Sequence, residues 1–160
     1  RALGNRSILA DPRSERFREL VNSKVKLREP WRPLASSVLE EEAAKYFVDT
    51  LSINAPFMSV ASGVVPGAKD LIPAVVHVDG TARPHTVHRD TNRKYWELIS
   101  NFQELTGIPV VLNTSFNVRG EPLVCTPTDA IRVFMSCGLD AMIIGDFLVE
   151  KSGDYGGLLS

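Results

Sequence analysis

The sequence predicts an α/β fold in which helices flank an open mixed sheet. Apolar residues recur at helical spacing in one long segment, as at Tyr95, Ile99 and Phe102, which is typical of an amphipathic helix. Short β-branched runs such as 110–113 and 141–144 are typical of strands. Hairpin signals occur beside strand–helix–strand units, and this mixture favours a mixed sheet covered by helices.

The composition is that of a soluble globular chain of about one domain. Hydrophobic residues make up 44% of the 160 residues and charged residues 23%. No apolar run approaches the roughly 18 residues that a membrane span needs. The two cysteines, Cys125 and Cys137, are too few for a disulfide scaffold, so we expect buried thiols and a reducing, cytoplasmic compartment. Since the chain begins at Arg1 without Met or an apolar leader, we expect residues 1–160 to be one domain of a longer protein.

In the first half of the chain, capping and proline signals divide helices from strands. Asp11 and Pro12 predict a helix start, because Asp is a good cap and Pro suits the first helical position. Pro30 and Pro33 exclude a helix around them. The expected elements are a strand over 5–10, a helix that buries Phe17, Leu20 and Val21, a loop or irregular strand over 24–31, an acidic-ended helix over 40–47, and a strand over 58–65.

In the second half, tight turns and glycines set the boundaries. Asp79-Gly80 predicts a hairpin between strands 74–78 and 81–87, and Gly107 ends a long helix. Thr126 and Pro127 predict another helix start. The remaining expected elements are a helix over 92–106 burying Tyr95, Leu98, Ile99, Phe102 and Leu105, a strand over 110–113, a helix burying Ile131, Phe134 and Met135 that Gly138 closes, and strands over 141–144 and 147–150, before a tail from Ser152.

Positive charge is concentrated near the N-terminal end. Residues 1–32 carry nine of the 18 basic side chains but only four of the 19 acidic ones, although the net charge of the chain is −1. Arginine binds phosphate and carboxylate well, so an anionic ligand near this segment is one interpretation. A solvated helix face is the alternative for Arg13, Arg16 and Arg18. The basic run is short and poor in aromatic residues, so we expect no nucleic-acid groove.

Lys26, Arg28 and Arg32 form a cluster of cations between two prolines. In an extended segment these side chains would project to one side. Three cations held together repel one another unless an anion neutralises them, so the cluster predicts a phosphate site. Salt bridges to the chain's own acids are the alternative.

The segment 77–83 places polar side chains around a tight turn. His77 and Asp79 would share one face of a regular strand, but a metal site would need a third ligand, and none stands at a telling spacing. We therefore expect His77 to be a hydrogen-bonded strand residue. Arg83, just after the turn, is placed to reach a ligand, whereas His85 and His88 are expected at the surface.

A polar stretch, residues 113–117, follows the buried strand 108–112. Small hydroxyl and amide side chains at the carboxyl end of a strand are placed to bind ligand oxygens, with local turn capping as the alternative. The residues alone do not favour Ser115 as a nucleophile, because it lies outside a Gly-x-Ser-x-Gly elbow and no His–Asp partner can be assigned. No glycine-rich phosphate loop occurs, so any ATP would bind without one.

Four motifs, in this order, resemble one known family. They are RALGNRSI at 1–8, KLREPWRP at 26–33, HVDGTAR at 77–83, and LNTSFN at 112–117 followed by Gly-Glu-Pro at 120–122. Together they resemble the C-terminal domain of the nodulation-type O-carbamoyltransferases over residues 1–151. The resemblance implies a YrdC-like fold, which is an open twisted α/β sheet.

The resemblance also implies an activity. Carbamoyl phosphate and ATP, with Mg²⁺, would react through carbamate to give carbamoyladenylate. A separate N-terminal domain of the ASKHA type, absent from this chain and carrying an iron site, would transfer the carbamoyl group to a substrate hydroxyl. Fixed cations suit this chemistry because both reactants are anions that repel each other. Lys26, Arg32 and Ser115 would be catalytic, and the nucleotide and anion contacts would fall on Arg1, Lys26, Arg32, Arg83, Ser115 and Asn117.

A second class of function uses the same cations. The domain would then be a non-catalytic module that binds a nucleotide or another anion and regulates or docks onto its N-terminal neighbour. Both hypotheses require Lys26, Arg32, Arg83 and Ser115 to meet in one cleft, and neither involves nucleic acid or a membrane.

Overall fold

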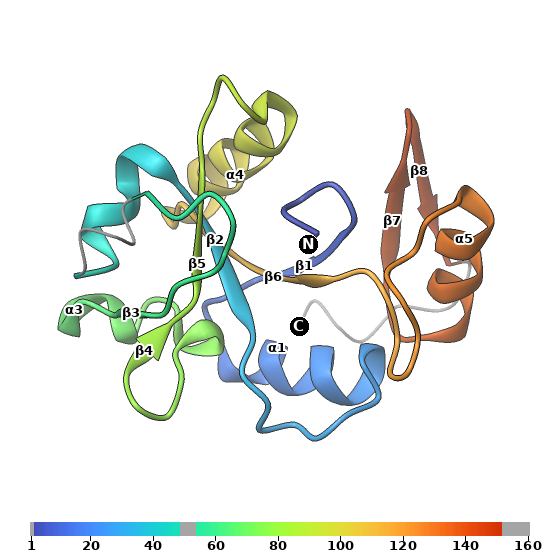
Figure 1. The fold of residues 1–160 in the computed structure, drawn as a ribbon, viewed down its shortest axis with the longest axis horizontal. Coiled ribbons are helices and arrows are strands. Elements are labelled where there is room, and N and C mark those ends of the chain that lie inside the picture. The colour runs from blue at the N-terminus through green and yellow to red at the C-terminus, as the bar shows by residue number, and fades with distance from the viewer. Residues whose placement is uncertain (1, 49–53, 152–160) are drawn as a thin grey trace.

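A four-stranded sheet lies at the centre of the computed structural model, which describes residues 2–48 and 54–151 (Figure 1). The strand order is β1 (Ser7–Ala10), β6 (Val110–Ser115), β2 (Ala35–Leu39) and β5 (Pro84–Val87). Strand β6 is antiparallel to both β1 and β2, whereas β2 is parallel to β5. The predicted α/β architecture, a mixed open sheet with flanking helices, is confirmed.

One face of the sheet is covered by α4 (Arg93–Thr106). Tyr95 and Ile99 of this helix pack against Val111 and neighbouring strand residues. The helix ends as predicted at Gly107, whose φ of +78° suits glycine. The prediction that Leu98 and Leu105 are buried is wrong, since both are exposed. The buried stripe of α4 is narrower than the sequence pattern indicated.

Short helices and an irregular segment cover the opposite face. Val38, Val110 and Leu112 of the sheet are buried there in the largest apolar cluster. All five residues of β2 are buried, as a central strand covered on both faces requires. The covering elements are α1 (Glu15–Leu20), the π turn η1 (Val21–Val25), the 3₁₀ turns η2 (Glu40–Lys45) and η3 (Pro73–Val75), and α3 (Pro66–Lys69).

A second group of elements packs beside β1. It contains α5 (Pro127–Ser136) and the hairpin of β7 (Ala141–Ile144) and β8 (Phe147–Glu150), at the right of Figure 1. Thr126 caps α5 as predicted, and Asp129 completes a capping box. Phe134 is buried as predicted, but Ile131 and Met135 are exposed because α5 buries Ala130, Val133 and Phe134 instead.

The first helix does not begin where the sequence predicts. Ser14 is its cap, while Asp11 accepts hydrogen bonds from the backbone and side chain of Arg13 in a turn before the helix. The helix then continues as the π turn through Val25, so Lys24 and Val25 are not part of a loop. The 24–31 segment is therefore not extended, and Lys26 has helical backbone angles.

Two predicted strands are largely wrong. Of residues 58–65 only β3 (Ser62–Gly63) is a strand, and residues 74–78 contain part of η3 instead, because proline begins a helical turn at Pro73. The segment 81–87 is divided at Arg83. Its first part, β4 (Thr81–Ala82), pairs with β3, and its second part, β5, pairs with β2. No helix within the described residues is long and apolar enough to span a membrane.

Candidate functional site

A pocket of about 410 Å³ opens where β6 ends. Chain segments that are far apart in the sequence form its walls, so the fold and not local sequence creates it. The strand β6 contributes Asn113, Thr114 and Ser115. The remaining walls come from Ala2, Leu3, Arg28, Arg32, Pro33, Leu34, Met58 and Arg83. We call this hollow the basic pocket.

Three arginines, Arg28, Arg32 and Arg83, line the basic pocket. The pKa of Arg28 is lowered by burial and by the positive charges of Arg32 and Arg83, against the opposing charge of Glu29. No carboxylate is among the residues that line the pocket. The pocket is therefore built to attract an anion.

The acidic side chain of Glu29 lies near this cluster. Glu29 forms an ion pair with Arg32 at 3.7 Å, and both side chains are about half exposed. The pKa of Glu29 is lowered by a hydrogen bond to its own backbone and by the charges of Arg119, Arg32 and Arg28. A long, exposed ion pair contributes little energy. The alternative of salt bridges is thus met for Arg32, by a weak pair that leaves its side chain about half exposed.

Backbone strain is concentrated at the basic pocket. Leu3, Leu27 and Met58 are the residues other than glycine with positive φ in the described chain, at +47°, +50° and +53°. Two of them line the pocket, and Leu27 directly precedes Arg28. Such conformations cost of order 1–3 kcal/mol each and gather at functional sites. The strain is an argument for function that does not depend on charge.

Lys26 lies behind the pocket wall. Only 4% of its surface is exposed. Its Nζ donates to the carbonyl oxygens of Ser115 and Asn117 at 2.7 and 2.9 Å, and to their side-chain oxygens at 3.2 and 2.5 Å. An ammonium has three N–H groups, so these four acceptors engage all of them. Burial and the charge of Arg28 lower the pKa of Lys26 to about 8.

The hydroxyl of Ser115 belongs to the same network. Ser115 Oγ donates to Asn117 Oδ1 at 2.7 Å, and Asn117 Nδ2 donates to the carbonyl of Glu121 at 2.7 Å. Lys26 thus fixes the turn that presents Ser115 to the pocket. The side chains of 113–115 belong to the strand β6 itself, so the loop predicted from Asn113 begins later, after Ser115.

The structure brings most of the predicted site residues together. Arg32, Arg83 and Ser115 line the basic pocket, and Lys26 and Asn117 contact Ser115 from behind. The prediction that Lys26 projects beside Arg28 and Arg32 is wrong, because the π turn directs it inward. Arg1 lies outside the described residues. The resemblance implies no role for Arg28, although the position of this residue between Lys26 and Arg32 in the sequence indicates one.

The prediction that His85 lies at the surface is wrong. His85 is 5% exposed and stacks on Tyr95. Its Nδ1 lies 3.0 Å from Ser37 Oγ, and Asn113 Nδ2 donates to both Ser37 Oγ and Tyr95 Oη. Burial lowers the pKa of His85 to about 4, so the ring is neutral at pH 7. Sequence reasoning missed this network because α4 covers β5 only in the folded chain.

The remaining polar residues hold structural positions. His77 is not in a strand; its Nδ1 lies 3.1 Å from Thr81 Oγ1 in the turn that Asp79 also stabilises. His88 is exposed as predicted. Cys137 is buried as predicted, whereas Cys125 is exposed. Within residues 2–48 and 54–151, no three His, Cys, Asp or Glu side chains group together to hold a metal ion.

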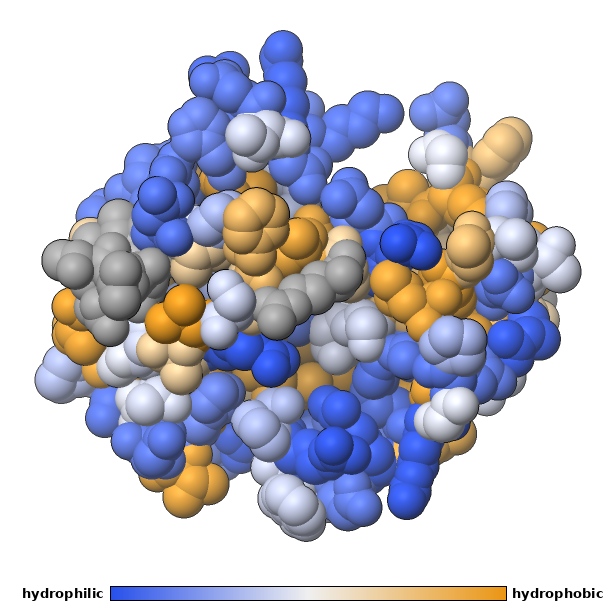
Figure 2. Space-filling view, viewed as in Figure 1, coloured by the Kyte–Doolittle hydropathy of each residue, from blue (hydrophilic) through white to orange (hydrophobic). Residues whose placement is uncertain are grey.

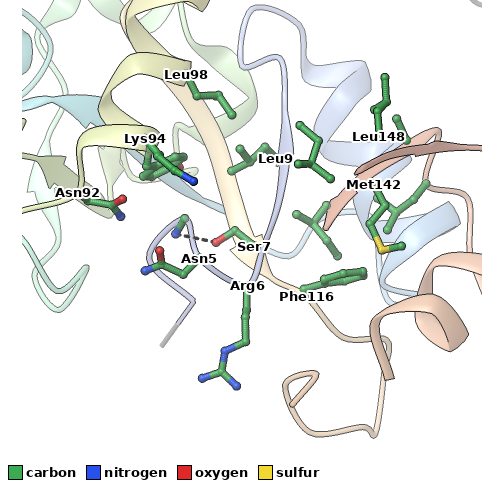
Figure 3. A pocket seen from close by; sticks show the side chains of 16 residues that line it. Asn5, Arg6, Ser7, Leu9, Asn92, Lys94, Leu98, Phe116, Met142 and Leu148 are labelled. Atoms are coloured by element: carbon green, nitrogen blue, oxygen red, sulfur yellow. Dashed lines mark hydrogen bonds between the residues drawn. The ribbon is translucent and has the colours of Figure 1, made fainter. Parts of the chain in front are cut away.

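A second pocket, of about 470 Å³, lies between β1, α4 and the β7–β8 hairpin. Figure 3 shows Leu9, Phe116, Met142 and Leu148 around it, with Lys94 extending from α4. Apolar side chains also gather on the surface beside β7 and β8 in Figure 2. We call this hollow the apolar pocket. Most of the side chains that line it are apolar, so it is less suited to bind an anion than the basic pocket is.

Comparison with known proteins gives a family for these features. Residues 1–151 match the family model described as Carbamoyltransferase C-terminus. The nodulation proteins NolNO of Sinorhizobium fredii and NolO of Bradyrhizobium diazoefficiens are 47% and 46% identical over 94% of the chain. An uncharacterized protein of Methanocaldococcus jannaschii is 46% identical over 94% of the chain. The chain spans only 22%, 28% and 24% of these relatives.

Proposed function

This chain belongs to the carbamoyltransferase C-terminus family, and on that premise we propose that its basic pocket binds carbamoyl phosphate and ATP and forms carbamoyladenylate. A further, N-terminal domain of the longer protein transfers the carbamoyl group from this intermediate to a substrate hydroxyl. The reaction takes place in the cytoplasm, where ATP is available.

The observation that carries the proposal is the meeting of Arg28, Arg32 and Arg83 in a pocket without a lining carboxylate. The volume, about 410 Å³, lies within the range of roughly 300–1,000 Å³ that is usual for small-molecule sites. Carbamoyl phosphate and ATP are both anions and repel each other. Guanidinium forks neutralise phosphate oxygens by paired hydrogen bonds, so the two reactants approach only where several arginines are fixed.

The reaction runs in two steps. Water hydrolyses carbamoyl phosphate to carbamate, inorganic phosphate and a proton. A carbamate oxygen then attacks the α-phosphorus of ATP, the bond to the bridging oxygen breaks, and pyrophosphate leaves with the electron pair. Negative charge rises on the phosphoryl oxygens during this attack, and Arg32 and Arg83 stabilise it.

The hydroxyl of Ser115 contacts the reacting oxygens rather than forming a covalent bond. Its proton is already directed to Asn117 Oδ1, and no histidine is among the hydrogen-bond partners that the structure gives this hydroxyl. Lys26 and Asn117 keep Ser115 at the pocket wall, and the ammonium adds positive potential behind it. A direct contact of Lys26 with substrate stays a prediction.

Magnesium accompanies the nucleotide in this proposal. The described residues that line the pocket include no carboxylate, so they do not form a protein site for the ion. Mg²⁺ is often held mainly by substrate phosphates and water. No step of the proposed chemistry is assigned to a protein-bound metal, and the iron that the resemblance implied belongs to the N-terminal domain.

Exchange of labelled pyrophosphate into ATP tests the proposal. We expect the full-length protein to catalyse exchange only when carbamoyl phosphate is present, and we expect Arg32→Ala and Lys26→Ala to abolish it. Lys94→Ala is a matched control, because this cation lines the apolar pocket instead. Exchange that survives in Arg32→Ala would contradict the assignment of the site.

The same samples distinguish a non-catalytic binding module. Calorimetry with ATP and with carbamoyl phosphate measures binding separately from turnover. Binding of both ligands without any exchange in the full-length protein would replace the enzyme by a regulatory or docking module. Absence of binding would overturn both functions.

A further inference from the structure

One buried asparagine connects the parts of the arginine-bearing loop. Asn22 lies in the π turn η1 and is 0% exposed. The loop that follows carries Arg28 and Arg32 into the basic pocket. A fully buried amide needs partners for both its donors and its acceptor, and these partners show what Asn22 does.

All of those partners lie in the loop. Asn22 Nδ2 donates to the carbonyl oxygens of Pro30 and Arg32 at 3.0 and 2.9 Å. Asn22 Oδ1 accepts from Arg28 Nε at 2.8 Å. The backbone carbonyl of Asn22 also accepts from the N–H of Arg28 at 2.9 Å. One residue therefore holds the loop at three of its positions.

The bond to Arg28 fixes the direction of its guanidinium. With Nε directed at Asn22, four N–H donors remain on the two Nη nitrogens of this arginine, which is one of the residues that line the pocket. The bond to the carbonyl of Arg32 fixes the backbone from which the second arginine extends. The strained conformation of Leu27, φ +50°, is held between these contacts.

We infer that Asn22 is a positioning residue that holds Arg28 and Arg32 in the geometry that binds phosphate oxygens. The inference rests on the proposed function and extends it to a residue that does not line the pocket. Only an amide of this length combines two donors and one acceptor at this point. Aspartate would keep the acceptor for Arg28 but lose both donors, and leucine would lose all three contacts at similar volume.

The position of Asn22 in a π turn supports the inference. A π turn widens one turn of a helix, and such turns often occur at functional sites. Here the turn leads directly into the loop, and Lys26 N donates to the carbonyl of Val21 at its end. The same turn thus directs Lys26 to the Ser115 network and begins the loop that Asn22 holds.

Calorimetric titration of carbamoyl phosphate, and separately of inorganic pyrophosphate, into wild type, Asn22→Leu and Ser23→Ala tests the inference. We expect Asn22→Leu to weaken both affinities by about 10- to 100-fold, the range that loss of an outer-shell partner costs at metal sites. Ser23→Ala is the control, because Ser23 is exposed and its hydroxyl donates to the carbonyl oxygen of Glu19, outside the arginine-bearing loop.

Fluorescence separates positioning from a general loss of stability. Trp31 lies in the held loop and is 73% exposed. In a Trp96→Phe background it is the only tryptophan of the chain. We expect Asn22→Leu to lower the anisotropy of Trp31 at a temperature where circular dichroism shows the fold intact. An unchanged Trp31 signal with unchanged affinities would overturn the inference.

A second variant covers the case in which Asn22→Leu does not fold. Arg28→Lys keeps the charge but has no Nε to donate to Asn22, so we expect its affinity for carbamoyl phosphate to fall at least about fivefold. Wild-type affinity in Arg28→Lys would overturn the inference. If wild type binds neither anion, the proposed function fails; if wild type binds and Arg32→Ala does not, while Asn22→Leu binds normally, only the inference fails.

Discussion

The two pockets of this chain have similar volumes, about 410 and 470 Å³, but different walls. The basic pocket has three arginines and strained backbone at Leu3 and Met58. The apolar pocket is lined mostly by leucine, isoleucine, methionine and aromatic side chains, with the cations Arg6 and Lys94 among them, and some of its apolar side chains, such as Ile143 at 71%, are largely exposed. Volume alone does not distinguish the two, whereas charge and backbone strain do.

The two regions are joined by one buried network. Asn113 lines the basic pocket and donates to the hydroxyl of Tyr95, which lines the apolar pocket. Ser37 and His85 complete the network between them. We therefore expect a substitution of a charged side chain to affect only the pocket that it lines. A substitution in the buried network should affect both pockets.

The largest effect is expected from the core beneath the apolar pocket. Phe134 is 1% exposed in the cluster that also contains Val133 and Met142. Phe134→Ala removes buried area and leaves a cavity, so we expect the free energy of unfolding to fall by about 3–5 kcal/mol. Urea titration measures it, and Met135→Ala, 65% exposed, is the control. An equal loss in both variants would mean that α5 does not bury the face observed.

The next largest effect is expected on ligand affinity in the basic pocket. Hydrogen bonds to charged groups are worth about 1.5–3 kcal/mol each, so we expect Arg32→Ala with Arg83→Ala to weaken carbamoyl phosphate binding about a hundredfold or more. Stability should change little, because neither side chain is buried. Calorimetry gives the affinity. A comparable loss in Lys94→Ala would erase the distinction between the pockets.

We expect acid pH to lower the free energy of unfolding through His85, which belongs to the network between the two pockets. Its pKa is about 4 in the folded chain and about 6.5 when unfolded, so the unfolded chain binds a proton first as the pH falls below 6.5. We expect about 2 kcal/mol of stability to be lost between pH 7.5 and 5. Denaturant titration at both pH values measures the loss.

Two histidine variants identify the source of that pH dependence. His85→Phe keeps an aromatic ring against Tyr95 and cannot be protonated, so we expect most of the loss to disappear, leaving the share of His77, whose pKa is also lowered by burial. His88→Gln changes an exposed histidine and should retain the full loss. A loss of unchanged size in His85→Phe would assign the acid sensitivity to other groups.

The smallest effect is expected on the open face of the β7–β8 hairpin. Ile143 is 71% exposed, and substitutions at exposed positions usually change stability by no more than about 0.5 kcal/mol. Ile143→Thr keeps a β-branched side chain and should stay within this range in urea titration. A loss of about 2 kcal/mol would show that this face is packed rather than open.

Local signals predicted the parts of the fold that depend on local chemistry. The cap at Thr126 and the end of α4 at Gly107 follow from backbone hydrogen bonding and a positive φ, which neighbouring residues determine. The strand over 74–78 failed because its apolar pattern fits a buried 3₁₀ turn equally well. Ala74 and Val75 are fully buried there, so burial does not distinguish the two.

The candidate site also contains residues that local sequence signals predict and residues that they do not. Arg32, Arg83 and Ser115 could be named in advance because cations beside prolines or after a tight turn, and a hydroxyl at the carboxyl end of a strand, are placed to reach a ligand. Asn22 could not, because an asparagine inside a helical segment normally faces solvent, and its partners at Pro30 and Arg32 are backbone atoms without a sequence signature. Its role depends on the π turn, which no local pattern indicated.

Nuclear magnetic resonance of the arginine Nε–H groups during titration with carbamoyl phosphate tests the central claim most directly. We predict saturable shifts of Arg28, Arg32 and Arg83 with one common dissociation constant. Arg6, which lines the apolar pocket, should not shift. Absence of any saturable shift in the three pocket arginines, or shifts of equal size in Arg6, would contradict the account.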